Sequence, residues 1–403
     1  MMRMSWLALA GILLLPAADA KAMDFSVDAY VDARLVLPPG EKSWLDGGLG
    51  KFRFGADQPT PNLRLVEAVA QGTLSITDEL HAVGVLRLEP KQPSGIDVLE
   101  TYLTWRPAAS GDWRWSVKAG AFFPPVSVEN DDLGWTSPYT LTPSAINSWV
   151  GEELRTIGGE GTLVRHTDWG TLSAIGALFC CNEPAGTVMA DRGWALDDRP
   201  TGLFERLRLP DATVRLFGGT PPGRTGLFEN IDGQVGWYAG LRADVSGLGQ
   251  VTVLRYDNNA DPNAYTSRDS SWLTRFWSVA LKTRLAGVTL LAQGFAGDTA
   301  IGDGTGDLYT TDFDSAFLLA SYDIDDWRVS GRIEAFNTRN ADGPIFNEDG
   351  HALTAALSWS AREWLRLSAE VLNIDSRRSE RVLEGAPVQR NDTQFQLSAR
   401  VFL

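Results

Sequence analysis

The chain has 403 residues, a net charge of −15 and an isoelectric point near 4.7. The acidic balance argues against a nucleic-acid-binding protein, and the length exceeds that of most single soluble domains. Because no linker, low-complexity run or change of composition divides the chain, we nevertheless expect one domain after the N-terminal segment.

The N-terminus, residues 1–20, predicts a secretory signal peptide. Arg3 supplies a positive charge, residues 6–16 form an apolar run too short to cross a bilayer, and an Ala-Asp-Ala triplet ends at position 20. We expect cleavage after this triplet, with cleavage after Ala22 as the alternative. The mature domain, residues 21–403, is therefore predicted to be exported.

Short segments of alternating apolar and polar residues make up most of the remaining chain. Near the C-terminus, Phe395 and Leu397 alternate with Gln396 and Ser398. This alternation predicts antiparallel strands over residues 25–36, 63–76, 79–89, 96–106, 113–121, 155–166, 169–179, 204–209, 212–217, 234–245, 250–257, 275–285, 288–296, 315–324, 327–336, 351–359, 363–372 and 392–403.

Tight turns alternate with longer connections along this series of predicted strands. Eight tight turns and nine longer connections predict a transmembrane antiparallel β-barrel of about 18 strands, with both chain ends on the side of the tight turns. The hairpin over residues 204–217 is the least regular part of the pattern. Without it the count is sixteen, which we keep as the alternative.

The two faces of the predicted strands fit lipid outside a barrel and water inside it. A soluble β-protein would alternate as well. The membrane barrel is favoured because six tryptophans fall mostly near predicted strand ends, where aromatic girdles occur. They are Trp105, Trp113, Trp169, Trp237, Trp327 and Trp359.

Residues 122–153 interrupt the alternation for about thirty residues, far longer than an ordinary connection. The stretch is rich in apolar and aromatic residues such as Trp135, so we expect it to pack against other parts of the chain. Thr142 followed by Pro143 predicts a helix start, and residues 143–150 predict a short helix.

This arrangement resembles the outer-membrane porins of Gram-negative bacteria, in which the third extracellular loop folds into the pore and narrows it. Residues 122–153 form the third long connection in the predicted order. The entry to this stretch also resembles the phosphate-selective porin family through Gly120, Pro124 or Pro125, Ser127 and Glu129. Phe122 and Phe123 stand where that family has a Lys, so phosphate selectivity is not predicted.

The inward side of the predicted strands is basic, although the chain is acidic overall. We expect these bases to line the pore and to favour anions. The alternative is that they only pair with inward glutamates. The bases are Arg114, Lys118, Arg206, Arg208, Arg242, Lys282, Arg284, Arg328, Arg332, Arg366 and Arg400.

Residues 122–153 are expected to face these bases across a constriction, where opposed charges would orient and filter solutes. A lid packed over the mouth of the barrel is the alternative. The residues assigned to the constriction are Glu129, Asp131, Asp132, Trp135, Trp149, Glu152 and Glu153.

The resemblance and the basic lumen together predict a passive outer-membrane channel for small hydrophilic solutes or ions. The expected partners are outer-membrane lipid, lipopolysaccharide and these solutes, and a homotrimer is weighed against a monomer. A non-conducting structural or adhesion barrel is the alternative, followed by a barrel hydrolase. No catalytic residue is predicted, because His81, His166 and His351 fall on separate strands or strand ends without a nucleophile motif.

No cofactor or metal is predicted. Acidic connections at 257–263 and 303–307 carry oxygen ligands that suit calcium, although neither has the full spacing of a calcium site. Cys180 and Cys181 are adjacent and cannot form a framework of spaced disulfides, so we expect a structural or incidental role for them. A vicinal disulfide, which would be strained, is the alternative in an oxidising compartment.

Overall fold

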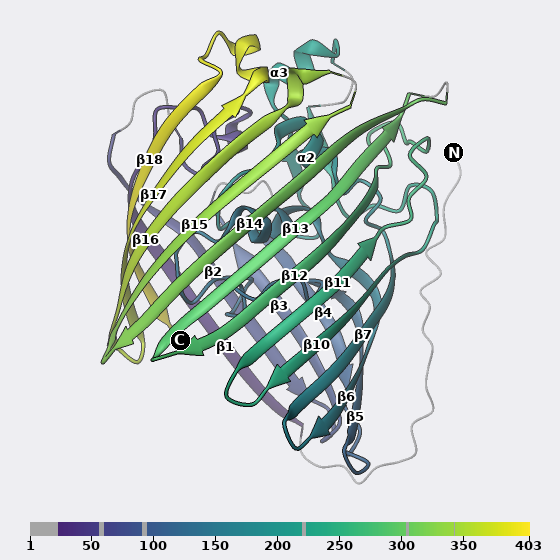
Figure 1. Cartoon of the computed structure of the whole chain (residues 1–403), viewed down its shortest axis with the longest axis vertical. Coiled ribbons are helices and arrows are strands. Elements are labelled where there is room, and N and C mark those ends of the chain that lie inside the picture. Colours follow the sequence, from purple (N-terminus) through teal and green to yellow (C-terminus); the bar gives the residue numbers. More distant parts are fainter. Residues whose placement is uncertain (1–22, 56–59, 91–94, 220–222, 304–305, 342) are drawn as a thin grey trace.

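The chain forms a closed antiparallel β-barrel in a computed structural model (Figure 1). The structure describes residues 23–55, 60–90, 95–219, 223–303, 306–341 and 343–403. The predicted signal peptide lies outside the described residues. The all-β barrel that the alternation predicts is confirmed.

Sixteen strands form the wall, and pairing of β1 with β18 closes it. Chain neighbours pair throughout, except that β7 pairs with β10. The wall strands are β1 (Asp24–Leu37), β2 (Asn62–Ser75), β3 (Leu80–Leu88), β4 (Ile96–Trp105), β5 (Trp113–Phe122), β6 (Thr156–Thr167), β7 (Gly170–Cys180), β10 (Gly236–Val245), β11 (Gly249–Asp257), β12 (Leu273–Leu285), β13 (Val288–Gly302), β14 (Leu308–Ile324), β15 (Trp327–Asn340), β16 (Glu348–Arg362), β17 (Leu365–Arg378) and β18 (Gln389–Phe402).

The predicted count of 18 strands is wrong, and the alternative of sixteen is confirmed. The error lies in the hairpin predicted over residues 204–217. There, β8 (Arg206–Arg208) pairs with β9 (Arg224–Gly226) in a separate two-stranded sheet, and residues after β8 form a helix. Pro210 and Asp211 begin that helix instead of forming a turn, because Pro and Asp suit the first turn of a helix as well as a loop.

In the part of the chain that the structure describes, six short helices lie in the connections. They are η1 (Trp44–Asp46), α1 (Ala145–Glu153), α2 (Thr187–Arg192), α3 (Asp211–Leu216), η2 (Pro344–Phe346) and η3 (Ser379–Glu384). Among the described residues, none of the helices has the length and apolar character needed to cross a membrane.

The outer face of the wall is apolar and the inner face is covered. In β14, Leu318 and Tyr322 are exposed, whereas Phe317 and Leu319, on either side of Leu318, are buried. Five of the six tryptophans predicted near strand ends are exposed, and the sixth, Trp359, stacks on the exposed Trp327. An exposed apolar band with tryptophans near its edges fits a wall surrounded by lipid.

The two ends of the barrel differ in their connections. One end carries tight turns such as 286–287 and 325–326, together with the start of β1 and the end of β18. The other end carries the long connections, and α3 stands above that rim at the top of Figure 1. Three of these connections are the longest, and we call them the 38–61, 123–155 and 181–235 segments.

Candidate functional site

The inner face of the wall is covered around its whole circumference. Every one of the sixteen wall strands carries at least one inward side chain that is less than a tenth exposed, including Asp32, Glu67 and Gln396. A wide water-filled lumen beside these inward side chains would leave them accessible to water. The contacts described below show that the 38–61, 123–155 and 181–235 segments cover them.

An aromatic row covers the inner face of six consecutive wall strands. Neighbouring ring centroids lie 4.7 Å apart between Tyr256 and Phe276 and 4.3 Å apart between Phe276 and Phe295. Gly297 makes this packing possible, since a Cβ there would lie 2.6 Å from that of Phe276. The row consists of Phe179, Tyr238, Tyr256, Phe276, Phe295 and Phe313, all at most 3% exposed.

Helix α1 places Trp149 against this aromatic row. The Trp149 ring lies 5.4 Å from Phe313, 5.5 Å from Phe295 and 5.8 Å from Phe276, mostly edge-on, which is a favoured arrangement of aromatic rings. Trp194 of the 181–235 segment adds a second indole 6.3 Å from Trp149. Both indoles are fully buried, so the two segments form one apolar core with the wall.

The predicted helix exists but begins later than expected. Ser144, not Thr142, is its N-cap, and its side chain accepts a hydrogen bond from the Asn147 amide. The helix then runs from Ala145 to Glu153, three residues beyond the predicted end at 150.

Arg332 on β15, the strand beside β14, binds the residues at the start of α1. Its guanidinium pairs with Glu129 at 2.7 Å and with Glu334 at 2.8 Å, and donates to the carbonyl oxygens of Thr142 and Pro143. The carboxylate of Glu334 accepts from the Ala145 amide at 2.8 Å. All three charged side chains are fully buried, so each charge depends on the others.

A second buried ion cluster joins β1 to the 38–61 and 181–235 segments. Asp198 lies between Arg34, at 2.6 Å, and Arg53, at 3.0 Å, and Arg53 also contacts Glu89 at 3.2 Å. Burial alone would raise the pKa of Asp198, but the two guanidinium groups hold it below its usual value.

Glu152 and Glu153 do not face wall arginines, contrary to the sequence prediction. Glu152 forms a two-point ion pair with Arg192 of α2, with contacts of 2.9 and 2.7 Å. Glu153 accepts the amides of Gly186, Val188 and Met189 at 3.0 Å each. Both lie at the C-terminal end of α1, which abuts α2, so they join two segments to each other.

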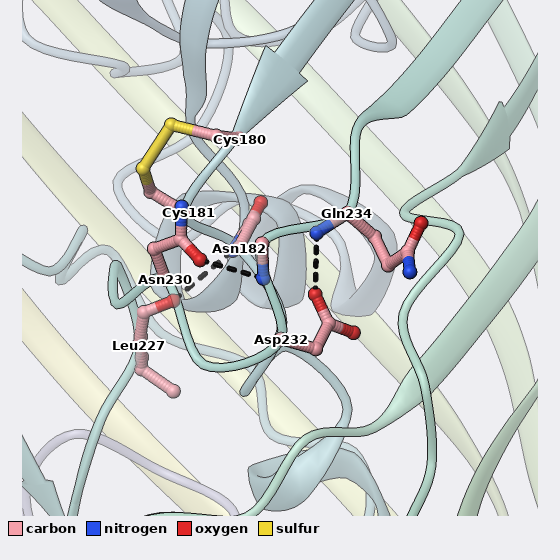
Figure 2. The surroundings of a disulfide bond; sticks show 8 residues. Cys180, Cys181, Asn182, Leu227, Asn230, Asp232 and Gln234 are labelled. Atoms are coloured by element: carbon pink, nitrogen blue, oxygen red, sulfur yellow. Dashed lines mark hydrogen bonds between the residues drawn. A yellow bond between two sulfur atoms is a disulfide. The ribbon is translucent and has the colours of Figure 1, made fainter. Parts of the chain in front are cut away.

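Asn182 connects the bases of the two longest segments, directly after a disulfide between Cys180 and Cys181 (Figure 2). Its amide donates to the carbonyls of Glu153, at 2.9 Å, and Leu227, at 3.2 Å. Its carbonyl accepts from the Tyr256 hydroxyl at 3.0 Å. The paired cysteines therefore lie where the chain leaves β7 and turns into the interior.

A cavity of about 630 Å³ lies between residues 123–135 and the short-turn half of the wall. At and beside it, Asp131 pairs with Lys282 at 2.7 Å and Asp132 contacts Arg366 at 3.7 Å. Further lining groups include Asp28, Glu100, Lys118, Asn130, Trp135 and Arg242. Acidic groups of the segment thus face basic groups of the wall.

Nine of the eleven predicted pore-lining bases lie on wall strands. Only Arg332 and Arg400 among them are buried, and Arg400 pairs with Asp32 at 3.0 Å. The nine are Arg114 and Lys118 on β5, Arg242 on β10, Lys282 and Arg284 on β12, Arg328 and Arg332 on β15, Arg366 on β17, and Arg400 on β18.

Arg206 and Arg208 are not on the wall, so their predicted placement on a wall strand is wrong. They belong to β8, beside the long-connection rim, because the hairpin predicted around them does not form.

Sequence reasoning missed the aromatic row and the ion pairs that cross the interior. Strand parity does place Phe276 and Arg34 inward, but their partners come from distant positions such as Trp149 and Asp198. Only the three-dimensional arrangement of the segments reveals these contacts.

No three His, Cys, Asp or Glu side chains among the described residues gather closely enough to hold a metal ion. Asp257 and Asp261 accept backbone amides within their own connection. Part of the 303–307 connection lies outside the described residues. Calcium binding at these connections stays a prediction.

Comparison with known proteins finds structural likeness only. No family model matches the chain, and no curated protein does. Among solved structures, the trimer form of OmpT, an outer membrane protein of Vibrio cholerae, matches with a TM-score of 0.55 and 10% identity over 95% of this chain and all of that one. The outer membrane channel DcaP of Acinetobacter baumannii matches with a TM-score of 0.53 and 11% identity over 96% of this chain and 100% of that chain.

An anion-selective porin from Comamonas acidovorans matches with a TM-score of 0.52 and 12% identity over 94% of this chain and 100% of that chain. At such low identities these likenesses show the fold alone. The chain shares the barrel fold of these outer-membrane proteins over nearly its full length.

Proposed function

We propose that the chain is a passive channel for small hydrophilic solutes in the outer membrane of a Gram-negative cell. The observation that carries this proposal is the closed sixteen-stranded wall with an apolar outer face and charged inward groups. The fold shared with an outer membrane channel and a porin supports it. Trimeric assembly, as in the OmpT trimer form, is part of the proposal.

The 123–155 segment is the proposed constriction. Its contacts with Arg332, Glu334 and the aromatic row hold it against the inner wall, where it would narrow the path of solutes. The opposed pairs Asp131–Lys282 and Asp132–Arg366 would place a transverse field beside that path.

Channel activity is tested with the purified chain in liposomes and planar bilayers. We expect swelling with small sugars, and a higher single-channel conductance after deletion of residues 131–148. Deletion of the exposed residues 382–385 in the connection before β18 is the matched control and should leave conductance unchanged. Unchanged conductance in the 131–148 deletion would rule out the constriction.

The proposed leaning towards anions rests on inward bases such as Arg242 and Arg284, which have no acidic partner within ion-pairing distance among the described residues. Reversal potentials measured across a KCl gradient check this leaning. A preference for cations would contradict it.

A structural barrel without flux is the second candidate, and the filled interior favours it. Trp149, Trp194 and the surrounding ion pairs form a packed core where an open channel would hold water. Absence of swelling with every solute, together with unchanged impermeability in the 131–148 deletion, would support this second function.

A further inference from the structure

The β8–β9 ribbon has one buried face and one arginine face. Leu207 and Thr225, which pair across the ribbon, are 2% and 4% exposed. Leu207 packs in an apolar cluster with Trp44 of η1 and Leu227. Because strand side chains alternate, the residues flanking Leu207 and Thr225 must point to the other side.

That other side brings arginines together. Arg208 and Arg224 are direct cross-strand partners, an arrangement that is destabilising for two like charges unless something neutralises them. Together with Arg206 and Arg268 they line a cavity of about 740 Å³, and Asp211 is the only acidic residue among the described residues that line it. We call these four arginines the arginine cup.

The charges of the cup are only partly balanced. Arg206 pairs with Glu229 at 2.9 Å and with Asp269 at 2.8 Å. Arg208 pairs with Asp211 at 2.8 Å, and the same carboxylate also pairs with Lys42 at 3.0 Å.

Two arginines of the cup, Arg224 and Arg268, have no carboxylate among the described residues to balance their charge. Arg224 donates to the carbonyl oxygen of Arg206 at 3.2 Å. Within the described residues, no carboxylate lies at ion-pairing distance from Arg224 or Arg268. The cavity therefore presents two positive charges that nothing in the described chain neutralises.

An adjoining recess of about 270 Å³ supplies a second, independent observation. Arg206, Arg208 and Arg224 line it as well, and its other charged lining residues are Arg199, Asp46, Glu89 and Glu205. Arg199 and Glu205 are 4% and 7% exposed and pair with each other, yet each retains a buried polar atom, Nη1 of Arg199 and Oε2 of Glu205, that has no hydrogen-bond partner among the described residues. Buried polar atoms are rarely left unpaired, because each costs free energy.

We propose that the arginine cup binds a small organic polyanion that carries two or more carboxylate or phosphate groups and a hydroxyl. Guanidinium groups bind both kinds of anion in two-point contacts. The hydroxyl would donate to Glu205, while an anionic oxygen would accept from Arg199. The volume of the cavity suits an organic molecule. This site lies beside the rim, and its binding does not depend on solute flux.

The test is isothermal titration calorimetry on the full chain in detergent, at fixed ionic strength. The probes are citrate, which has three carboxylates and a hydroxyl, tricarballylate, which lacks the hydroxyl, and pyrophosphate. We expect saturable binding of citrate or pyrophosphate, and weaker binding of tricarballylate than of citrate. Binding of pyrophosphate alone would assign phosphate groups to the ligand, and binding of citrate alone would assign carboxylates.

Variants decide whether the arginine cup is responsible. Arg224→Gln and Arg268→Gln should each weaken binding by about tenfold, and the double variant should abolish it. Arg362→Gln, at the short-turn end, is the matched control and should bind normally. Gel electrophoresis of unheated and heated samples checks folding, because a folded barrel migrates differently from the heat-denatured chain. No saturable heat with either anion at about 10 mM, or full binding by the double variant, would overturn the proposal.

Discussion

The two halves of the inner wall bind the 38–61, 123–155 and 181–235 segments through different kinds of interaction. Strands β7 and β10–β14 present the aromatic row, which packs on Trp149 without directional bonds. Strands β15–β18 and β1–β4 present buried ions such as Arg332 and Arg34, which bind specific backbone and carboxylate groups. The aromatic half therefore supplies most of the cohesion, and the ionic half fixes the position of each segment.

The largest effect should come from Trp149→Ala, which removes the centre of the aromatic half. We expect the free energy of opening the 123–155 segment to fall by about 3–5 kcal/mol, as for other buried aromatic truncations. Native-state hydrogen exchange of α1 amides measures this opening. Trp277→Ala, on the exposed side of β12, is the matched control and should leave α1 protected. Equal protection in both variants would mean that the aromatic row does not anchor the segment.

On the ionic half, Arg332→Gln should lower the same opening free energy by about 3 kcal/mol. The substitution leaves the carboxylates of Glu129 and Glu334 buried without their cation, which is costlier than losing an exposed pair. A second variant, Arg332→Gln with Glu129→Gln, should recover part of the loss, because one uncompensated charge is removed. No recovery would show that the guanidinium acts only through its backbone hydrogen bonds.

Asp191 of α2 should make the ionic half sensitive to alkaline pH. Burial, and then the nearby Glu380, raise the pKa of Asp191 to about 8. A carboxyl whose pKa is raised in the folded state stabilises it fully below the unfolded pKa near 4, and this stability is lost as pH rises through the folded value.

Between pH 7 and pH 9 we therefore expect the 181–235 segment to lose roughly 1 kcal/mol of opening free energy. Proteolysis of this segment as a function of pH measures the loss. Asp191→Asn should flatten this profile, because its side chain carries no titrating carboxyl group. An unchanged profile in Asp191→Asn would assign the pH dependence to another group.

The smallest effect is expected from Lys282→Gln. Lys282 and Asp131 are both about a third or more exposed, and exposed pairs contribute roughly 0–1 kcal/mol. Hydrogen exchange should change little, whereas the reversal potential should shift towards cations because a positive group beside the proposed path is lost. A large loss of protection would mean that this pair belongs to the packed core.

Alternation of apolar and polar residues predicts the wall strands well, because one face of each strand lies on the outside of the barrel and the other faces its interior. The predicted strand 327–336 lies within β15, which extends to Asn340. The predicted strands 288–296 and 315–324 are shorter than β13 and β14, because their extensions beyond the apolar band are polar and no longer alternate. Alternation gives the wrong prediction at Arg206-Leu207-Arg208, because the three-residue strand β8 alternates in the same way as a wall strand.

The candidate site was harder to predict than the wall. The sequence indicates that residues 122–153 are packed and that Arg332 points inward, but not that the two meet. Contacts such as Arg332–Glu129 join positions about two hundred residues apart, and no local pattern specifies them. Within the 181–235 segment alternation predicts only a hairpin over residues 204–217, which gives no sign that the segment covers the interior.

Closure of the barrel between β1 and β18 has a consequence for the order of folding. The seam joins residues such as Arg34 and Gln396, which are 362 positions apart. Inward residues at and beside the seam also bind the segments inside the barrel, through Asp198 and the Leu141 amide. Loop-closure entropy makes so distant a pairing slow to form. We therefore expect the segments to collapse onto the central strands first, with the seam closing last around an interior that is already occupied.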